Sequence, residues 1–301
     1  MQSRVFRKVF LIVIVVVGWL GWSGVAHAQE EDDSKAIKAE VFIKERPASA
    51  KRNRSTGKYR PSAKLANDIQ STPPPGTSFV QVGVTFWRFR PSTAADKTKE
   101  LVEEEASGPT EWTLERIEEG TPLSPGQRVR ISIESLTRAG YLYVIDREQY
   151  TDGSLGDPML VFPTEKTSEA NYVRAGRLVY IPSATGKFRI KPSEASKVHV
   201  GELVTIVVAP QALIEAKQLS AKAIKLPRQQ VESWEKQWGT KTTRFELDGG
   251  AGQAMTEKEQ AAGANSSSQL TQEDPVPQTV YRMAVKPTDT IILSVPLKFR
   301  R

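Results

Sequence analysis

The chain has 301 residues, of which 39% are hydrophobic and 26% charged, and its formal net charge is +7. It contains no cysteine, which excludes a disulfide framework, a thiolate metal site and a cysteine nucleophile. Stability must therefore come from an ordinary hydrophobic core, for which the chain is long enough. The positive charge is mild and unevenly placed, and nucleic acid is not expected as a partner, because the basic residues show no regular interleaving with aromatic ones.

The N-terminal 28 residues have the three-part layout of a secretory signal. Three basic residues (Arg4, Arg7, Lys8) precede a continuous apolar stretch, Val9 to Leu20, and Ala26-His27-Ala28 offers a cleavage site. We expect a bacterial protein that is exported to the periplasm or the cell surface, with no transmembrane helix after cleavage. An uncleaved anchor is the alternative, because no charge interrupts residues 9–28. Cleavage would lower the net charge to +4.

Residues 29–75 are predicted to form a disordered basic leader, because few large apolar residues accompany its charges. An acidic patch at 30–33 is followed by a basic run that ends before Pro73-Pro74-Pro75. The plain interpretation is a solvated tail, and the functional one is attachment to an anionic polymer or lipid surface. The candidate polyanion contacts are Lys51, Arg52, Arg54, Lys58 and Arg60.

From residue 76 to 210 the pattern changes to short stretches of period two, separated by Gly and Pro turns about every ten residues. This spacing predicts an antiparallel β-sandwich, Ig-like or jelly-roll-like. A parallel sheet is not expected, because strands do not alternate with helices in the sequence. The expected strands are Val80–Trp87, Trp112–Ile117, Arg128–Ser135, Tyr141–Ile145, Met159–Phe162, Leu178–Ile181, Lys187–Ile190 and Glu202–Ala209.

Beyond residue 210 we expect a helical insertion at 211–240, in which Trp234 and Trp238 pack the helix onto the sheet. Residues 241–278 are rich in Gly, Ser, Gln and Ala and are predicted to be a flexible linker. Two final strands within 279–301 should return to the main sheet, since a hairpin alone is marginal in water. The fold class is thus mainly β, with a short helical insertion and a disordered N-terminal tail.

Between about Arg128 and Pro210, the sequence carries a series of short motifs in a fixed order. They are Gly140-Tyr141-Leu142-Tyr143, Phe162-Pro163, Ala175-Gly176 and Ile181-Pro182. Together they resemble the bacterial extracytoplasmic family called domain of unknown function 4384. The resemblance covers roughly a third of the chain. It implies an exported accessory or recognition module and gives no catalytic residue to carry over.

The residues that could support catalysis are few. His199 is the one histidine after the signal, too few for a zinc site, and no Gly-x-Ser-x-Gly elbow is present. Residues 183–187 contain a Gly-Lys pair without the opening glycine of a phosphate loop, and we interpret them as a hairpin turn. Glu134 and Asp146 are candidates for an acid/base pair, although solvated strand-end charges are the simpler interpretation. We predict no catalytic residue, no cofactor and no metal.

The loop that follows the Tyr141–Ile145 strand combines acidic residues with a tyrosine, and it is the candidate ligand or partner loop. A calcium site fits poorly, because the EF-hand pattern breaks at its fifth position, and an Asp-Gly hairpin turn is the plainer interpretation. Its candidate contact residues are Asp146, Arg147, Glu148, Tyr150, Asp152 and Asp157.

These observations favour a non-enzymatic exported β domain that binds a partner protein or an envelope polymer. The first alternative is a glycan-acting enzyme that uses carboxylates alone, which would need two carboxylates facing each other in a deep cleft. The second alternative is a structural subunit of a surface assembly, whose mark would be an exposed edge strand or a large apolar patch.

Overall fold

The computed structural model describes residues 43–48, 72–104, 108–191, 197–264 and 268–300. The folded unit falls within Ser34–Arg301. The predicted signal peptide and the candidate polyanion contacts at 51–60 lie outside the described residues. Within the described part of the chain, no helix is both long and apolar enough to cross a membrane.

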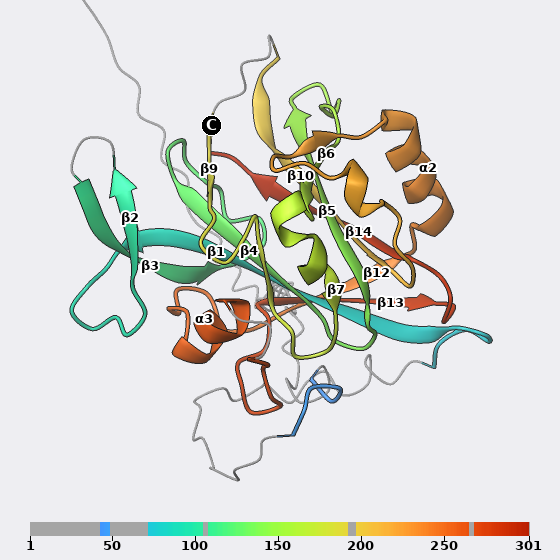
Figure 1. Cartoon of the computed structure of the whole chain (residues 1–301), viewed down its shortest axis with the longest axis horizontal. Helices are drawn as coiled ribbons and strands as arrows, with labels where there is room; N and C mark the ends of the chain where they lie inside the picture. The colour runs from blue at the N-terminus through green and yellow to red at the C-terminus, as the bar shows by residue number, and fades with distance from the viewer. Residues whose placement is uncertain (1–42, 49–71, 105–107, 192–196, 265–267, 301) are drawn as a thin grey trace, which may run out of the picture. The chain divides into compact units, whose positions relative to one another are not determined.

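In the described ranges, the strands form two antiparallel sheets, one of eight strands and one of six, as the alternating pattern predicts (Figure 1). The first sheet contains β1 (Ser78–Pro91), β2 (Glu100–Glu104), β3 (Gly108–Ile117), β4 (Arg128–Ser135), β8 (Val179–Ile181), β9 (Phe188–Arg189), β12 (Thr242–Glu246) and β13 (Thr279–Val285). The second contains β5 (Gly140–Tyr150), β6 (Met159–Phe162), β7 (Tyr172–Val173), β10 (His199–Ala209), β11 (Ile224–Lys225) and β14 (Ile291–Lys298).

The main core lies between the two sheets. Val82, Val84 and Phe86 of β1 face it from the first sheet, and Val144 and Ile206 face it from the second. These side chains alternate with residues on the other face of each strand, which is the period of two that the sequence shows. The fold is therefore a β-sandwich of two antiparallel sheets, as predicted.

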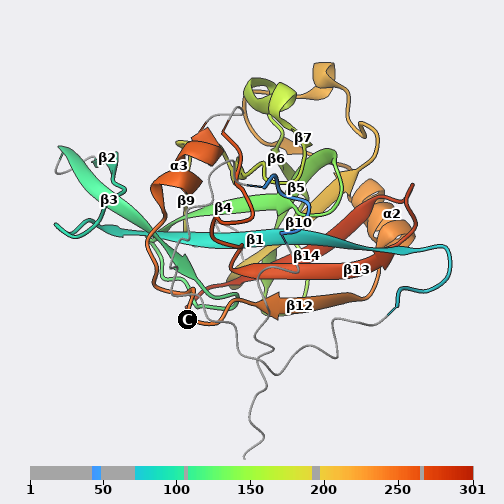
Figure 2. The ribbon, with the colours of Figure 1, turned by 90° about the horizontal axis from the view of Figure 1, so that it is seen from below.

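Both sheets are also covered on part of their outer faces. The helix α2 (Arg228–Trp238) packs Val231 and Trp234 onto the outer face of the second sheet, which confirms the expected role of the tryptophans. The helix α3 (Glu257–Ala264) and the residues around it cover Trp87 and Phe89 of β1 on the first sheet. Figures 1 and 2 both show α3 beside β1 and α2 at the β14 side of the domain. This second covering explains why β1 is buried on both faces.

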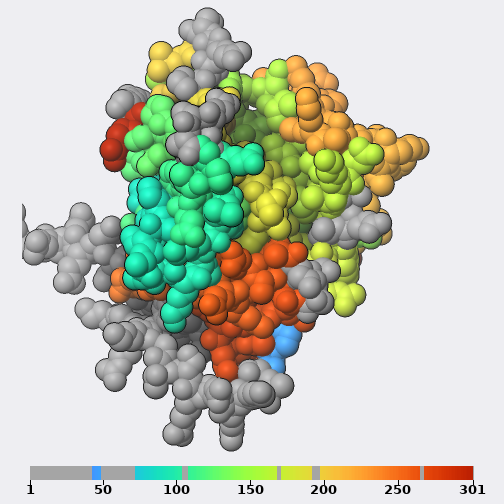
Figure 3. Space-filling model, turned by 60° about the vertical axis from the view of Figure 1, so that its left-hand side comes forward, coloured from blue at the N-terminus to red at the C-terminus, as the bar shows by residue number. Residues whose placement is uncertain are grey.

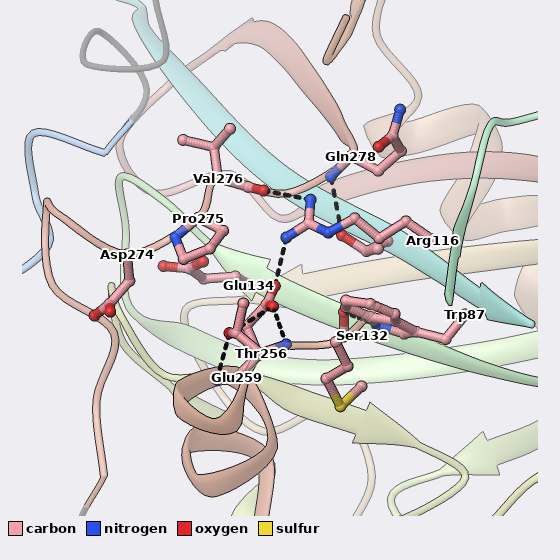
Figure 4. Close-up of polar contacts among 12 residues, drawn as sticks. Trp87, Arg116, Ser132, Glu134, Thr256, Glu259, Asp274, Pro275, Val276 and Gln278 are labelled. Atoms are coloured by element: carbon pink, nitrogen blue, oxygen red, sulfur yellow. Dashed lines mark hydrogen bonds and ion pairs between the residues drawn. The ribbon is translucent and has the colours of Figure 1, made fainter. Parts of the chain in front are cut away.

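The prediction of a flexible linker at 241–278 is wrong for the described part of that segment. It contains β12, which pairs with β13, and α3, which is fixed by a buried ion pair between Arg116 of β3 and Glu259. Arg116 also donates to the Val276 carbonyl at 2.7 Å (Figure 4). Although small and polar residues dominate, a few buried apolar side chains hold the segment in place: Phe245, Met255, Ala262, Leu270 and Val276.

Residues 43–48, which the sequence assigns to the basic leader, are packed against the domain. Ile43 is 3% exposed and Arg46 is 2% exposed. The Arg46 guanidinium donates to both carboxylate oxygens of Glu134, at 2.8 and 2.6 Å, and to the Thr271 carbonyl at 3.2 Å. Figure 3 shows these residues in blue against the orange-red atoms of the segment that contains α3. The prediction of a solvated tail therefore does not hold for 43–48.

Three smaller expectations also differ from the structure. Residues 211–222 contain only a 3₁₀ turn at Ala216–Gln218; a second 3₁₀ helix spans Glu165–Ala170. Residues 183–187 do not close a hairpin, because β8 and β9 both pair with β4 in succession. The two final strands return to the domain as predicted, but β13 joins the first sheet and β14 the second.

Candidate functional site

A pocket of about 540 Å³ opens between the two sheets. Its apolar wall comes from both sheets and includes Val129, Ile131, Val161, Val204 and Leu297. The aromatic side chains of Phe188 in β9 and Phe299 after β14 complete this wall. A concave, mostly apolar space with a few polar groups is typical of a small-ligand site.

The polar groups of the pocket come mainly from two neighbouring strands. Asp146 and Glu148 lie two residues apart on β5, so their side chains point to the same face. On β10, Glu202 is paired directly with Glu148, and Val204 is paired with Asp146. All four side chains line the pocket. Strand pairing therefore places three carboxyl groups together on the inner face of the second sheet.

His199 joins this group because of an irregularity in β10. In a regular strand, residues three apart point to opposite faces, so His199 and Glu202 should be separated. The pairing with β5 shifts between His199 and Gly201, which inserts one extra residue, as a β-bulge does. As a result, His199 Nε2 lies 3.1 Å from Glu202 Oε1, and both residues line the pocket.

Several of these polar atoms are shielded from solvent without a hydrogen-bond partner among the described residues. They are Asp146 Oδ1, Glu202 Oε2 and both ring nitrogens of His199. The close approach of His199 Nε2 to Glu202 lacks the alignment of a hydrogen bond, although the His199 side chain is only 4% exposed. Because buried polar groups in native proteins almost always have partners, this group of atoms is the strongest indication of a ligand.

The surroundings also change the protonation of two of the carboxyl groups. Burial raises the pKa of Asp146 to about 7, although a hydrogen bond from the Arg147 backbone lowers it in part. The charge of Glu148 adds a smaller increase. Burial, followed by the charges of Asp146 and Glu148, raises the pKa of Glu202 to about 9. The two groups titrate as a coupled pair. At neutral pH the pocket therefore holds at least one protonated carboxyl group.

The structure divides the predicted ligand loop into residues that share the pocket and residues that do not. Asp146 and Glu148 belong to the pocket, and both lie on β5 rather than in a loop. Tyr150, at the end of β5, donates its hydroxyl proton to Glu148. Arg147 points to the opposite face, where it pairs with Glu235 of α2.

The two remaining acidic residues of the predicted loop lie on the surface. Asp152 pairs with Lys197 at 2.8 Å, and Asp157 pairs with Lys225 at 2.5 Å and with Arg228 at 3.3 Å. Ion pairs of this kind between exposed side chains contribute little to stability. Neither aspartate lines the pocket.

The suggested partnership of Glu134 and Asp146 is wrong, and so is the simpler interpretation of Glu134 as a solvated strand-end charge. Glu134 is fully buried, accepts both hydrogen bonds from Arg46, and accepts another from the Gly176 backbone N–H at 2.8 Å. It does not line the pocket. Sequence reasoning missed Glu202 and set His199 aside, because the signal that joins them to Asp146 is strand pairing between distant segments.

The donor set of the pocket does not form a metal centre. Among the residues that the structure describes, no group of three or more His, Asp or Glu side chains has the arrangement needed to hold a metal ion. The chain also has no cysteine to supply thiolates.

No protein-family model, no curated protein and no solved structure matches the chain. The likeness to domain of unknown function 4384 therefore stays a hypothesis that rests on the short motifs alone. The geometry of the pocket is the main basis for a functional proposal.

Proposed function

We propose that this chain is an exported, non-enzymatic binding protein that takes a small ligand, or the side chain of a partner, into the pocket between its sheets. The single observation that carries the proposal is the group of shielded, unpartnered polar atoms on Asp146, His199 and Glu202. Their desolvation is costly in an empty pocket, and a ligand that hydrogen-bonds to them would remove that cost.

The size and lining of the pocket support the same proposal. A volume of about 540 Å³ lies within the range typical of small-molecule sites. The apolar walls would bury the body of a ligand, and the polar groups on β5 and β10 would orient it. Export to the periplasm or cell surface, as the N-terminal pattern suggests, would place this pocket among envelope components.

A neutral, polarity-sensitive dye such as Prodan tests whether the pocket takes up ligands. The full chain should bind the dye saturably, with a blue shift of its emission. Val161 is half-buried on β6 and lines the pocket, so Val161→Trp should fill the pocket and weaken binding at least tenfold. The control is Leu101→Trp, because Leu101 is 73% exposed on β2 and outside the pocket. No saturable binding, or binding that Val161→Trp leaves unchanged, would refute the proposal.

A carboxylate-based enzyme is the second candidate, and one observation favours it. Asp146 and Glu202 line the same pocket with pKa values that their surroundings hold apart, which is how acid/base pairs are commonly arranged. The apolar walls suit a glycan poorly, so binding remains our first proposal. Hydrolysis of 4-nitrophenyl glycosides by the full chain, lost in Glu202→Gln, would replace the binding proposal with this one.

A structural subunit of a surface assembly has less support. The large hydrophobic side chains that are exposed in the described part of the chain are Leu101, Tyr172 and Val198. Leu101 lies in β2, Tyr172 in β7, and Val198 directly before β10. Single exposed apolar residues are normal on a soluble surface, whereas assembly through an apolar surface needs a contiguous patch.

A further inference from the structure

We propose that the ligand of the pocket carries a primary ammonium group on an apolar body, and that Asp146, Glu202 and His199 receive the ammonium group. This inference rests on the proposed binding function and specifies its ligand class. It follows from three features of the pocket: the number of free acceptors, their charge and the apolar walls around them.

The acceptors match an ammonium group in number. A primary ammonium has three N–H donors and no acceptor. The pocket offers Asp146 Oδ1, Glu202 Oε2 and a ring nitrogen of His199, which in the neutral imidazole is an acceptor. Each of these atoms is shielded from solvent and lacks a hydrogen-bond partner among the described residues. Glu202 lies beside His199, with Oε1 3.1 Å from Nε2, and diagonal to Asp146 across the strand pair, so an ammonium group between these side chains would offer each of them a donor.

The charge of the interior favours a cation over a neutral or anionic group. Asp146, Glu148 and Glu202 share one face of the sheet, and two of them are directly opposite across the strands. Like charges in this position repel each other, and a bound cation converts the repulsion into attraction. Arg189 and Lys191 also line the pocket, but both are exposed. The basic groups therefore lie at the mouth of the pocket and the acidic groups inside.

Proton release on binding would distinguish an ammonium ligand from a neutral ligand of the same shape. With pKa values of about 7 and about 9, the coupled carboxyl groups of Asp146 and Glu202 together hold about one proton at pH 8. An ammonium group binds the ionised form of these carboxyl groups and so displaces that proton. The charged or titratable groups that face this pair are Glu148 on β5, His199 on β10, and Arg189 and Lys191 at β9. Binding of an alkylamine at pH 8 should thus release about one proton.

The test uses three probes that differ only in their end group: hexylamine, hexanol and hexanoate. Titration calorimetry of the full chain at pH 8, in two buffers of different ionisation enthalpy, gives affinity and proton release. We expect hexylamine to bind at least tenfold more tightly than hexanol, and hexanoate to bind most weakly. Glu202→Gln and Asp146→Asn should each weaken hexylamine binding about tenfold or more, and Glu202→Gln should abolish the proton release.

The matched control is Asp152→Asn, which removes an exposed carboxylate outside the pocket. Equal binding of the three probes, blocked by Val161→Trp, would refute the ammonium proposal and leave the binding function intact. Hexylamine binding without proton release, or unchanged in both carboxyl variants, would also refute it. No binding of any probe or of the neutral dye would overturn both proposals. The comparison among probes uses the unmodified chain, so it stays valid if a variant fails to fold.

Discussion

Glu202 lies directly opposite Glu148 across the β5–β10 pair, and both side chains line the pocket between the sheets. Two carboxyl groups in this position destabilise a sheet when both are ionised. Burial adds to the effect at Glu202, since it penalises the charged form of that carboxyl group. The pocket therefore reduces the stability of the fold, which is common where a protein keeps polar groups ready for a ligand.

The first prediction concerns stability and pH. The pKa values of Asp146 and Glu202 are raised in the folded state, so the folded chain binds more protons than the unfolded chain. Their contribution to stability must then fall as pH rises from about 4 toward 9. Relative to the double variant Asp146→Asn/Glu202→Gln, the unmodified chain should lose on the order of a few kcal/mol between pH 5 and 8. Urea unfolding of both proteins measures the difference, and parallel pH curves would contradict it.

The second prediction concerns the ion pair of Arg46 and Glu134. Both side chains are fully buried, and removal of one partner leaves an uncompensated charge. Arg46→Ala should lower the free energy of unfolding by about 3–5 kcal/mol. Lys44→Ala, two residues away and exposed, should change it by less than about 0.5 kcal/mol. Equal unfolding midpoints for the two variants in urea would show that residues 43–48 do not contribute to the fold.

The third prediction concerns Glu259, which pairs with Arg116 and also caps α3. Its carboxylate accepts from the Thr256 N–H at 3.0 Å and the Thr256 hydroxyl at 2.8 Å, as in a capping box. Glu259→Ala should therefore release α3 from the first sheet and leave the sandwich folded. Amide hydrogen exchange should accelerate at 257–264 while β1 and β13 stay protected. Glu257→Ala, at an exposed position of the same helix, is the control and should leave exchange unchanged.

The fourth prediction sets packing against helix propensity at Gly263. Alanine is a better helix former than glycine, so propensity alone predicts a gain of about 1 kcal/mol. A Cβ atom at Gly263 would lie 1.9 Å from Cε2 of Tyr180, whose hydroxyl is held by the Glu259 carbonyl at 2.9 Å. Gly263→Ala should thus destabilise the fold by about 1–3 kcal/mol. Ala261→Ser, exposed on the same helix, serves as the control; a stabilised Gly263→Ala would disprove the close packing.

The sandwich was predictable because its central strands alternate. Val82, Val84 and Phe86 repeat every second residue, and burial of one face follows from that period. The outer strands β2 and β12 were not predictable from the sequence, because they are short and polar and are held by pairing with β3 and β13. Residues 43–48 were misassigned because a buried arginine resembles a solvated one until its carboxylate partner, 88 positions later, is known.

The pocket was only partly predictable. Asp146 and Glu148 stand out beside a core strand, and their spacing of two puts them on one face. Glu202 joins them through the register of β5 with β10, which no local pattern specifies. His199 joins them through a bulge that reverses the expected alternation, and the nearby Gly201 has no Cβ to strike the Leu297 carbonyl. These relationships depend on pairing between distant segments.

The position of Arg46 also bears on when this chain can fold during its synthesis. Among its hydrogen-bond acceptors is the carbonyl of Thr271, which is made 225 residues later, and β1 must wait for β13 to emerge. Contacts between such distant segments close long loops and form late. A nascent chain therefore cannot complete its core until nearly all of it has left the ribosome. Such a delay would keep the polypeptide unfolded long enough to be threaded through a translocation channel, as the proposed export requires.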